Sequence, residues 1–189
     1  MRSVRHLLRL GTFAAVALVV STLRAEDDDS VSRVKFSDPA KPGVLKLVLP
    51  WADIKVRGTD GDEVVVHSSL GEKGRQESRP DGLRRLDDEV TFEVVEKNNV
   101  VTVGVSGDSA WTAHSAEFNI EVPRNTGLVI RTQAGGDILV EEIDGDLDIS
   151  NMNGEVILRD IGSSAVVNTM NGEIKATYRI APTKPVSFS

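Results

Sequence analysis

Acidic residues at a fixed spacing are the part of this sequence that could do chemistry. Asp137, Glu155 and Glu173 stand 18 residues apart, so a fold that repeats with this period stacks them in one row. Like charges on neighbouring strands lie about 5 Å apart and repel one another unless water or a cation separates them. Such a row raises two hypotheses, a calcium ladder and a pair of catalytic acids in a carbohydrate-active enzyme.

The same row also has a plainer interpretation, which we favour. Calcium takes about six to eight oxygen ligands, and three carboxylates spread over three turns of a repeat converge poorly on one ion. The sequence also lacks the Gly-Gly-x-Gly-x-Asp repeat that is typical of calcium-loaded solenoids. We therefore expect Asp137, Glu155 and Glu173 to form a solvated corner, with no metal, no cofactor and no catalytic residues.

The histidines and tryptophans are the other candidates for a site. His67 and His114 show no metal-ligand spacing, and Ser115 beside His114 is not a triad, because adjacent side chains point apart. Trp51 ends an apolar segment, which indicates packing. Trp111 lies in a polar segment and is the candidate for binding a ligand at the surface.

A nine-residue unit positions these residues, and it runs five times over residues 136–180. Apolar residues stand third, fifth and eighth in the unit. The third and fifth places share one face of a strand, and we expect the eighth to return inward after a corner. Arg179 breaks the pattern in the last unit. The inward set is Ile138, Val140, Ile143, Leu147, Ile149, Met152, Val156, Leu158, Ile161, Ala165, Val167, Met170, Ile174 and Ala176.

Units match best at 18 residues, which predicts an all-β fold, a single-stranded β-helix (β-solenoid) of coils of about 18 residues. Each coil is expected to stack on the one before it in the chain. Asn153-Gly154 and Asn171-Gly172 fit corners that need a positive φ. Because Asn-Gly is also the strongest hairpin signal, an antiparallel β-sandwich or meander remains the alternative.

The same strand pattern begins before the main repeat. Residues 43–67 supply inward pairs such as Leu45 and Leu47, and residues 116–130 continue the alternation with Phe118 and Ile120. A hairpin is expected at residues 97–99. Gly, Pro and charged residues interrupt the pattern at 68–89 and 107–115, which predicts two loop excursions.

The N-terminal residues indicate export. Residues 1–25 combine a basic start, an apolar stretch from Leu10 to Leu23 and a small residue at Ala25, as in a cleaved signal peptide. An uncleaved anchor is the alternative, although the stretch is short for a membrane span. Residues 26–42 are expected to form a flexible leader, and residues 43–189 the β-strand-repeat domain. A strand begins at Val186, so that domain is expected to be truncated at its C-terminus.

Charge limits the partners that the exported chain can have. Removing residues 1–25 takes away four arginines, so the 22 basic residues fall to 18 against 29 acidic ones. An acidic chain disfavours nucleic acid and anionic membrane surfaces. We expect a periplasmic, cell-surface or extracellular protein without a stable membrane span once the signal is cleaved.

Three segments resemble a known family: ADIKVRGTDGDEVVV, EFNIEVPRNTGLVIRT and GDLDISNMNGEVILRDI. They are similar to the bacterial adhesin-like family of exported β-strand-repeat proteins, and the resemblance covers residues 43–189. It implies an exported β-helix with no catalytic motif, which presents its surface to an envelope or matrix partner. The function expected is thus non-enzymatic, with the carbohydrate-active enzyme (lyase or hydrolase) as the alternative.

Overall fold

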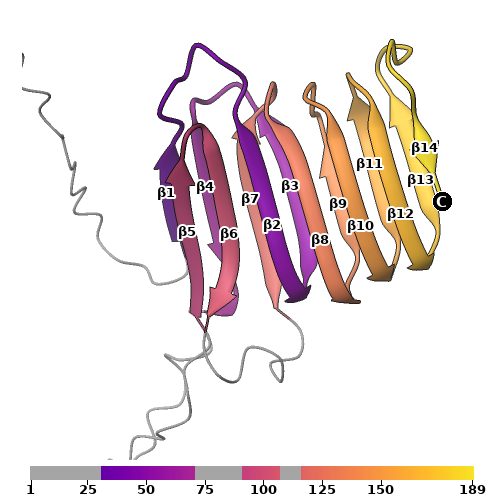
Figure 1. Cartoon of the computed structure of the whole chain (residues 1–189), viewed down its shortest axis with the longest axis horizontal. Coiled ribbons are helices and arrows are strands. Elements are labelled where there is room, and N and C mark those ends of the chain that lie inside the picture. The colour runs from indigo at the N-terminus through magenta and orange to yellow at the C-terminus, as the bar shows by residue number, and fades with distance from the viewer. Residues whose placement is uncertain (1–30, 71–90, 107–115) are drawn as a thin grey trace, which may run out of the picture.

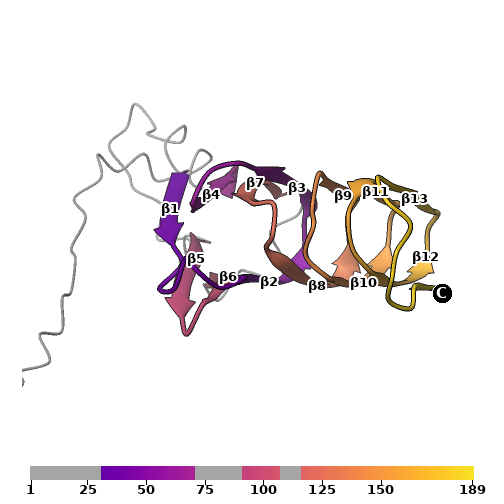
Figure 2. The ribbon, with the colours of Figure 1, turned by 90° about the horizontal axis from the view of Figure 1, so that it is seen from above.

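The computed structural model describes residues 31–70, 91–106 and 116–189, and these residues form two seven-stranded sheets (Figure 1). Seen from above, the sheets are two layers that run side by side along the long axis of the molecule (Figure 2). The described residues contain no helix long and apolar enough to cross a membrane. In spatial order, sheet A contains β1 (Val31–Lys35), β4 (Glu63–Ser68), β7 (Glu117–Pro123), β3 (Asp53–Thr59), β9 (Ile138–Glu141), β11 (Val156–Ile161) and β13 (Ile174–Tyr178).

Sheet B faces sheet A across the core, and its strands come from the alternate segments of the repeat. In spatial order it contains β14 (Ser187–Phe188), β12 (Ala165–Asn171), β10 (Leu147–Asn153), β8 (Gly127–Gly135), β2 (Val44–Trp51), β6 (Val100–Ser106) and β5 (Thr91–Lys97).

Parallel pairing dominates, and from β8 onward the chain alternates between the two sheets. β10 pairs in parallel with β8 and β12, and β11 pairs in parallel with β9 and β13. The partners Leu147 and Ala165 are one coil apart, as are Val156 and Ile174. This regular stacking is solenoid-like, as the repeat predicts. An antiparallel meander needs antiparallel neighbours, so residues 127–189 do not form one.

The order of the first coils differs from the order of the chain. β2 lies between β6 and β8, and β3 lies between β7 and β9, so the earliest unit sits inside the stack. After β3 the chain turns back as β4, which pairs antiparallel with β7. The β7–β8 connection then passes the end of β3, where the Arg124 N–H donates to the Thr59 carbonyl oxygen at 3.1 Å. The expectation that each coil stacks on the previous one is therefore wrong here, because local periodicity carries no information about which coils are neighbours.

Part of the predicted leader, residues 26–42, is structured. β1 pairs antiparallel with β4, and the Phe36 side chain is buried against the core. Gly43 lies so close to this ring that a Cβ there would be 2.3 Å from Phe36. β1 and Phe36 therefore belong to the folded domain, although the sequence placed them in the flexible leader.

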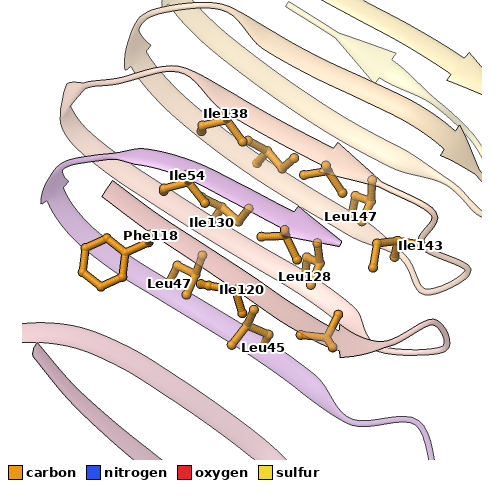
Figure 3. Close-up of a cluster of buried hydrophobic side chains, with 14 of the residues drawn as sticks. Leu45, Leu47, Ile54, Phe118, Ile120, Leu128, Ile130, Ile138, Ile143 and Leu147 are labelled. Carbon is orange, nitrogen blue, oxygen red and sulfur yellow. The ribbon is translucent and has the colours of Figure 1, made fainter. Parts of the chain in front are cut away.

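The third and fifth places of the repeat point inward, as predicted. Ile138, Leu147 and Leu158 are each at most 2% exposed, and Figure 3 shows such side chains from both sheets meeting in one core. Ile174 and Ala176, in the last described strand of sheet A, are only partly buried because no further strand covers them. The core thus comes from the strand alternation that the sequence displays.

The eighth place behaves differently in the two halves of a coil. Ile143 and Ile161 are fully buried, whereas Met152 and Met170 are 40% and 71% exposed, so the inward assignment of both methionines is wrong. The residue before each buried isoleucine, Glu142 or Asp160, has a positive φ (60° and 55°), which shifts the alternation by one residue. β10 and β12 run on without this shift.

The last unit lacks the shift as well. Tyr178, its seventh residue, pairs with Ile161, the eighth residue of its neighbour, across a register irregularity. Tyr178 therefore takes the inward place, and Arg179 is exposed. This explains why the repeat breaks at Arg179 in the sequence.

The predicted Asn and Gly turns follow their residue types, except at Gly172. Asn98 and Asn99 have φ of 55° and 65° in the predicted β5–β6 hairpin, and Gly154 has φ of 115°. Gly172 is not left-handed, contrary to expectation. It is needed for space instead, because a Cβ there would lie 1.9 Å from the Gly154 carbonyl oxygen.

Candidate functional site

The predicted acidic row exists, and it is longer than the sequence repeat suggested. Asp137 and Glu155 lie just before β9 and β11, and the Asp137 Oδ1 accepts the Glu155 N–H at 2.8 Å. The Asp53 Oδ1 accepts the Asp137 N–H at 2.9 Å, and Asp53 is the register partner of Glu117. With Glu173, the row contains five acidic residues, at the N-terminal ends of β7, β3, β9, β11 and β13.

Asp53 and Glu117 were missed because they stand outside the main repeat. Each nevertheless follows a buried alanine, Ala52 or Ala116, and begins an alternating strand. This is the small–acidic–apolar order that also introduces β9 and β11. A search for that order, rather than for the 18-residue period, would have found both residues.

The carboxylates of this row mostly serve the backbone and neighbouring lysines. Asp53 and Asp137 each accept a hydrogen bond from a backbone N–H of the next strand in the sheet. Glu155 and Glu173 share Lys175, whose Nζ lies 2.5 Å and 3.0 Å from their oxygens. The hydrogen bond to Glu155 raises the pKa of Lys175 most. Within residues 31–70, 91–106 and 116–189, no three His, Asp or Glu side chains converge to hold a metal ion.

An open groove of about 370 Å³ runs beside the acidic row on the outer face of sheet A. It crosses β7, β3, β9 and β11, which are consecutive in the sheet. One wall is the acidic row from Glu117 to Glu155, and we call the other wall the mixed row. The mixed row consists of the register partners Asn119, Lys55, Leu139 and Ile157.

Strand geometry fixes the dimensions of this groove. The two rows are separated by two residues along each strand, which is about 6.6 Å, and four strands span about 14 Å along the stack. Leu139 and Ile157 are half-buried and adjacent, so they form an apolar patch in the mixed row. The groove thus combines a negative wall with one that is apolar at Leu139 and Ile157 and polar at Asn119 and Lys55.

A second cluster of charges lies at the opposite ends of these strands. Glu142 binds Arg124 at 2.6 Å and Arg57 at 3.0 Å, and Arg124 also binds Asp60 at 3.0 Å. The hydrogen bond from Arg124, then that from Arg57, lowers the pKa of Glu142. Glu142 has a positive φ at a corner of the coil, and these ion pairs stabilise that corner. We therefore assign the cluster a structural role.

The histidine and tryptophan candidates are not brought together in the described part of the chain. His67 is exposed in β4, next to Val31 and Asn119. Trp51 is half-buried at the end of β2 and packs against the core, in agreement with its predicted packing role. Trp111, His114 and Ser115 lie outside the described residues, as does most of the 68–89 excursion.

The groove resembles a catalytic site in one respect only. Asp53 and Asp137, on adjacent strands, are about 5 Å apart, a spacing at which two carboxylates can cooperate in glycoside cleavage. A general acid, however, needs a raised pKa, which enzymes obtain by burying the carboxyl group. Both aspartates are exposed and bind backbone N–H groups. The geometry therefore suits attraction of a cation better than proton transfer.

Comparison with known proteins adds no relative to these observations. No protein-family model matches the chain, and no curated protein matches its sequence.

Proposed function

We propose that this protein is an exported, non-enzymatic module of the cell envelope, adhesin-like in role, which binds a partner through the outer face of sheet A. In this proposal the fold is a single-stranded β-helix with coils of about 18 residues. The groove beside the acidic row supports the proposal, because it is an open hollow formed by four consecutive strands of a regular sheet.

Rigidity supports a binding role. Every strand of the groove is hydrogen-bonded on both sides, since β7, β3, β9 and β11 all lie inside sheet A. Side chains on such strands keep their spacing, so a ligand meets a preformed surface and loses little affinity to ordering the protein. The basic and apolar start of the chain supports export.

A carbohydrate-active enzyme is the second candidate, and the adjacency of Asp53 and Asp137 favours it. An enzyme on this fold would use one carboxylate as acid and the other as base or nucleophile. Asn substitutions keep the backbone hydrogen bond and remove the charge. Asp53→Asn and Asp137→Asn are therefore the variants that separate catalysis from structure.

The experiment has two arms. Expression of the full chain in a bacterium, followed by fractionation and N-terminal sequencing, should find the mature protein outside the cytoplasm and cut near Ala25. Incubation of the purified protein with a panel of polysaccharides should release no reducing ends and no unsaturated products. Product formation that Asp53→Asn or Asp137→Asn abolishes would refute the binding role in favour of the enzyme, and an intact Met1 in the membrane fraction would show an anchor.

A further inference from the structure

The charges along the groove are not balanced. Lys55 is paired with Glu141 at 3.7 Å, and Lys175 is paired with Glu155 and Glu173. Among the described residues, no cationic side chain forms an ion pair with the other three members of the acidic row. These are Glu117, Asp53 and Asp137.

Of these three carboxylates, Asp137 stands beside the apolar patch, while Glu117 and Asp53 stand beside Asn119 and Lys55. Asp137, just before β9, and Leu139, within β9, are successive outward residues, and Ile157 is the register partner of Leu139. A ligand in the groove can therefore place a positive charge against the acidic row and a hydrocarbon segment against Leu139 and Ile157. Lysine and arginine side chains have this composition, an aliphatic stem with a cationic head.

We propose that the groove binds a basic, extended peptide segment of a partner protein. This proposal rests on the binding role above and names the chemical class of the partner. Alternate side chains of an extended peptide are about 6.6 Å apart, so the groove length of about 14 Å holds two or three of them. A cationic head that meets Asp137 lays its stem over Leu139 and Ile157, and further heads along the peptide meet Asp53 and Glu117.

An amino-sugar polymer could supply the same positive charge. Sugars, however, bind through aromatic platforms and dense hydrogen-bonding groups, whereas Phe118, the aromatic residue of the groove, is 1% exposed and turned into the core. The apolar patch is aliphatic and matches a methylene stem. These observations favour the peptide.

Fluorescence anisotropy with a labelled hexapeptide, Lys-Ala-Lys-Leu-Lys-Ala, tests the proposal on the purified full chain. The wild-type protein should bind it and lose affinity as salt rises, because exposed charges are screened. The triple variant Glu117→Gln/Asp53→Asn/Asp137→Asn should bind about tenfold more weakly, since each exposed ion pair contributes a factor of a few. The Asn side chains at positions 53 and 137 keep a carbonyl oxygen that can accept the backbone N–H groups of residues 137 and 155.

Two further variants test the proposal independently of the triple variant, in case that variant is less stable. The Glu117 carboxylate makes no hydrogen bond or ion pair with any described residue, so Glu117→Lys should leave the fold intact and weaken peptide binding. Glu121→Gln is the matched control, because Glu121 is exposed on the same strand but outside the groove.

Each outcome decides the question. Equal affinity of the wild-type protein, the triple variant and Glu117→Lys, or an equal loss in Glu121→Gln, would refute the groove as the peptide site. Tighter binding of a labelled glucosamine oligomer than of the peptide would refute the partner class. Neither result bears on the fractionation and polysaccharide experiments above, so failure here is distinct from failure of the proposed function.

Discussion

Ile161→Ala and Met170→Ala together test how the structure divides the eighth place of the repeat. Both residues hold the same place in the nine-residue unit, yet Ile161 is 0% exposed and Met170 is 71% exposed. A sequence-only view makes the two substitutions equivalent. The structure makes one a core truncation and the other a surface change.

The expected loss for Ile161→Ala has two parts. Removing three carbons forfeits about 2.4 kcal/mol at about 0.8 kcal/mol per buried methylene. A residual cavity of roughly 50 Å³ adds about 1.2 kcal/mol at about 24 cal/mol per Å³. We therefore expect Ile161→Ala to lower the free energy of unfolding by about 3–4 kcal/mol, and Met170→Ala by less than about 0.5 kcal/mol.

Urea unfolding followed by far-ultraviolet circular dichroism measures both losses at equal protein concentration. Solenoids open locally from their ends, so hydrogen exchange is a useful second measurement. Amides of β11 and β13 should exchange faster in Ile161→Ala than in the wild-type protein, and at an unchanged rate in Met170→Ala. Losses that agree within about 0.5 kcal/mol would refute the reasoning. So would a larger loss for Met170→Ala, since that result requires the methionine to be buried.

Three other predictions follow from the corners of the stack. Gly154→Ala should lower the free energy of unfolding by about 2 kcal/mol or more in urea, because its Cβ would lie 2.4 Å from the Gly136 carbonyl oxygen at a φ of +115°. Calcium should raise the melting temperature no more than sodium does at equal ionic strength, because the acidic row does not converge. Thermal stability should fall between pH 3.8 and about 2, since the hydrogen bond from Lys184, with weaker help from serines, lowers the pKa of Asp146 to about 2. A carboxyl group whose pKa is lower when folded stabilises the protein above its unfolded pKa and loses this effect as pH falls through the folded value.

Matched controls accompany these three. Gly104→Ala should be nearly neutral, because a Cβ there meets nothing within 4 Å; a loss equal to that of Gly154→Ala would contradict the steric argument. Calcium-specific stabilisation that Glu155→Gln removes would revive the metal hypothesis. Asp146→Asn should reduce the loss of stability between pH 3.8 and about 2 by about 1 kcal/mol or less, since the ion pair between Asp146 and Lys184 is half exposed. If the variant loses as much stability at low pH as the wild-type protein does, Asp146 is not the cause of that loss.

Strand alternation could be predicted from the sequence because it is a local property. Each inward residue, such as Ile149 or Leu158, is fixed by neighbours two positions away, and burial confirms both. The eighth place depends instead on one backbone dihedral angle. Glu142 and Asp160 are left-handed while Asn151 and Thr169, at the equivalent place, are not, although asparagine tolerates that conformation best. Residue type therefore predicts the wrong backbone conformation at these corners.

The site was predictable only where the period reached it. The 18-residue spacing placed Asp137, Glu155 and Glu173 in one row, but Asp53 and Glu117 join that row only because β3 lies beside β9 and β7 lies beside β3 in the sheet. The groove needs all four strands in that order. Since the order is set by a chain reversal after β3, no local pattern could reveal the groove.

The place of β2 and β3 within the stack affects how the protein can assemble. The first long strands to be synthesised find their sheet neighbours, β8 and β9, only when residues 127–141 have been added. Coils of an ordinary solenoid can be added in order, but here an early segment must wait for later ones on both sides. Closing such long loops before contacts form slows folding. Removal of residues 43–59 would take out the middle of the molecule rather than its end, so the N-terminal part of the domain holds the two halves of the stack together.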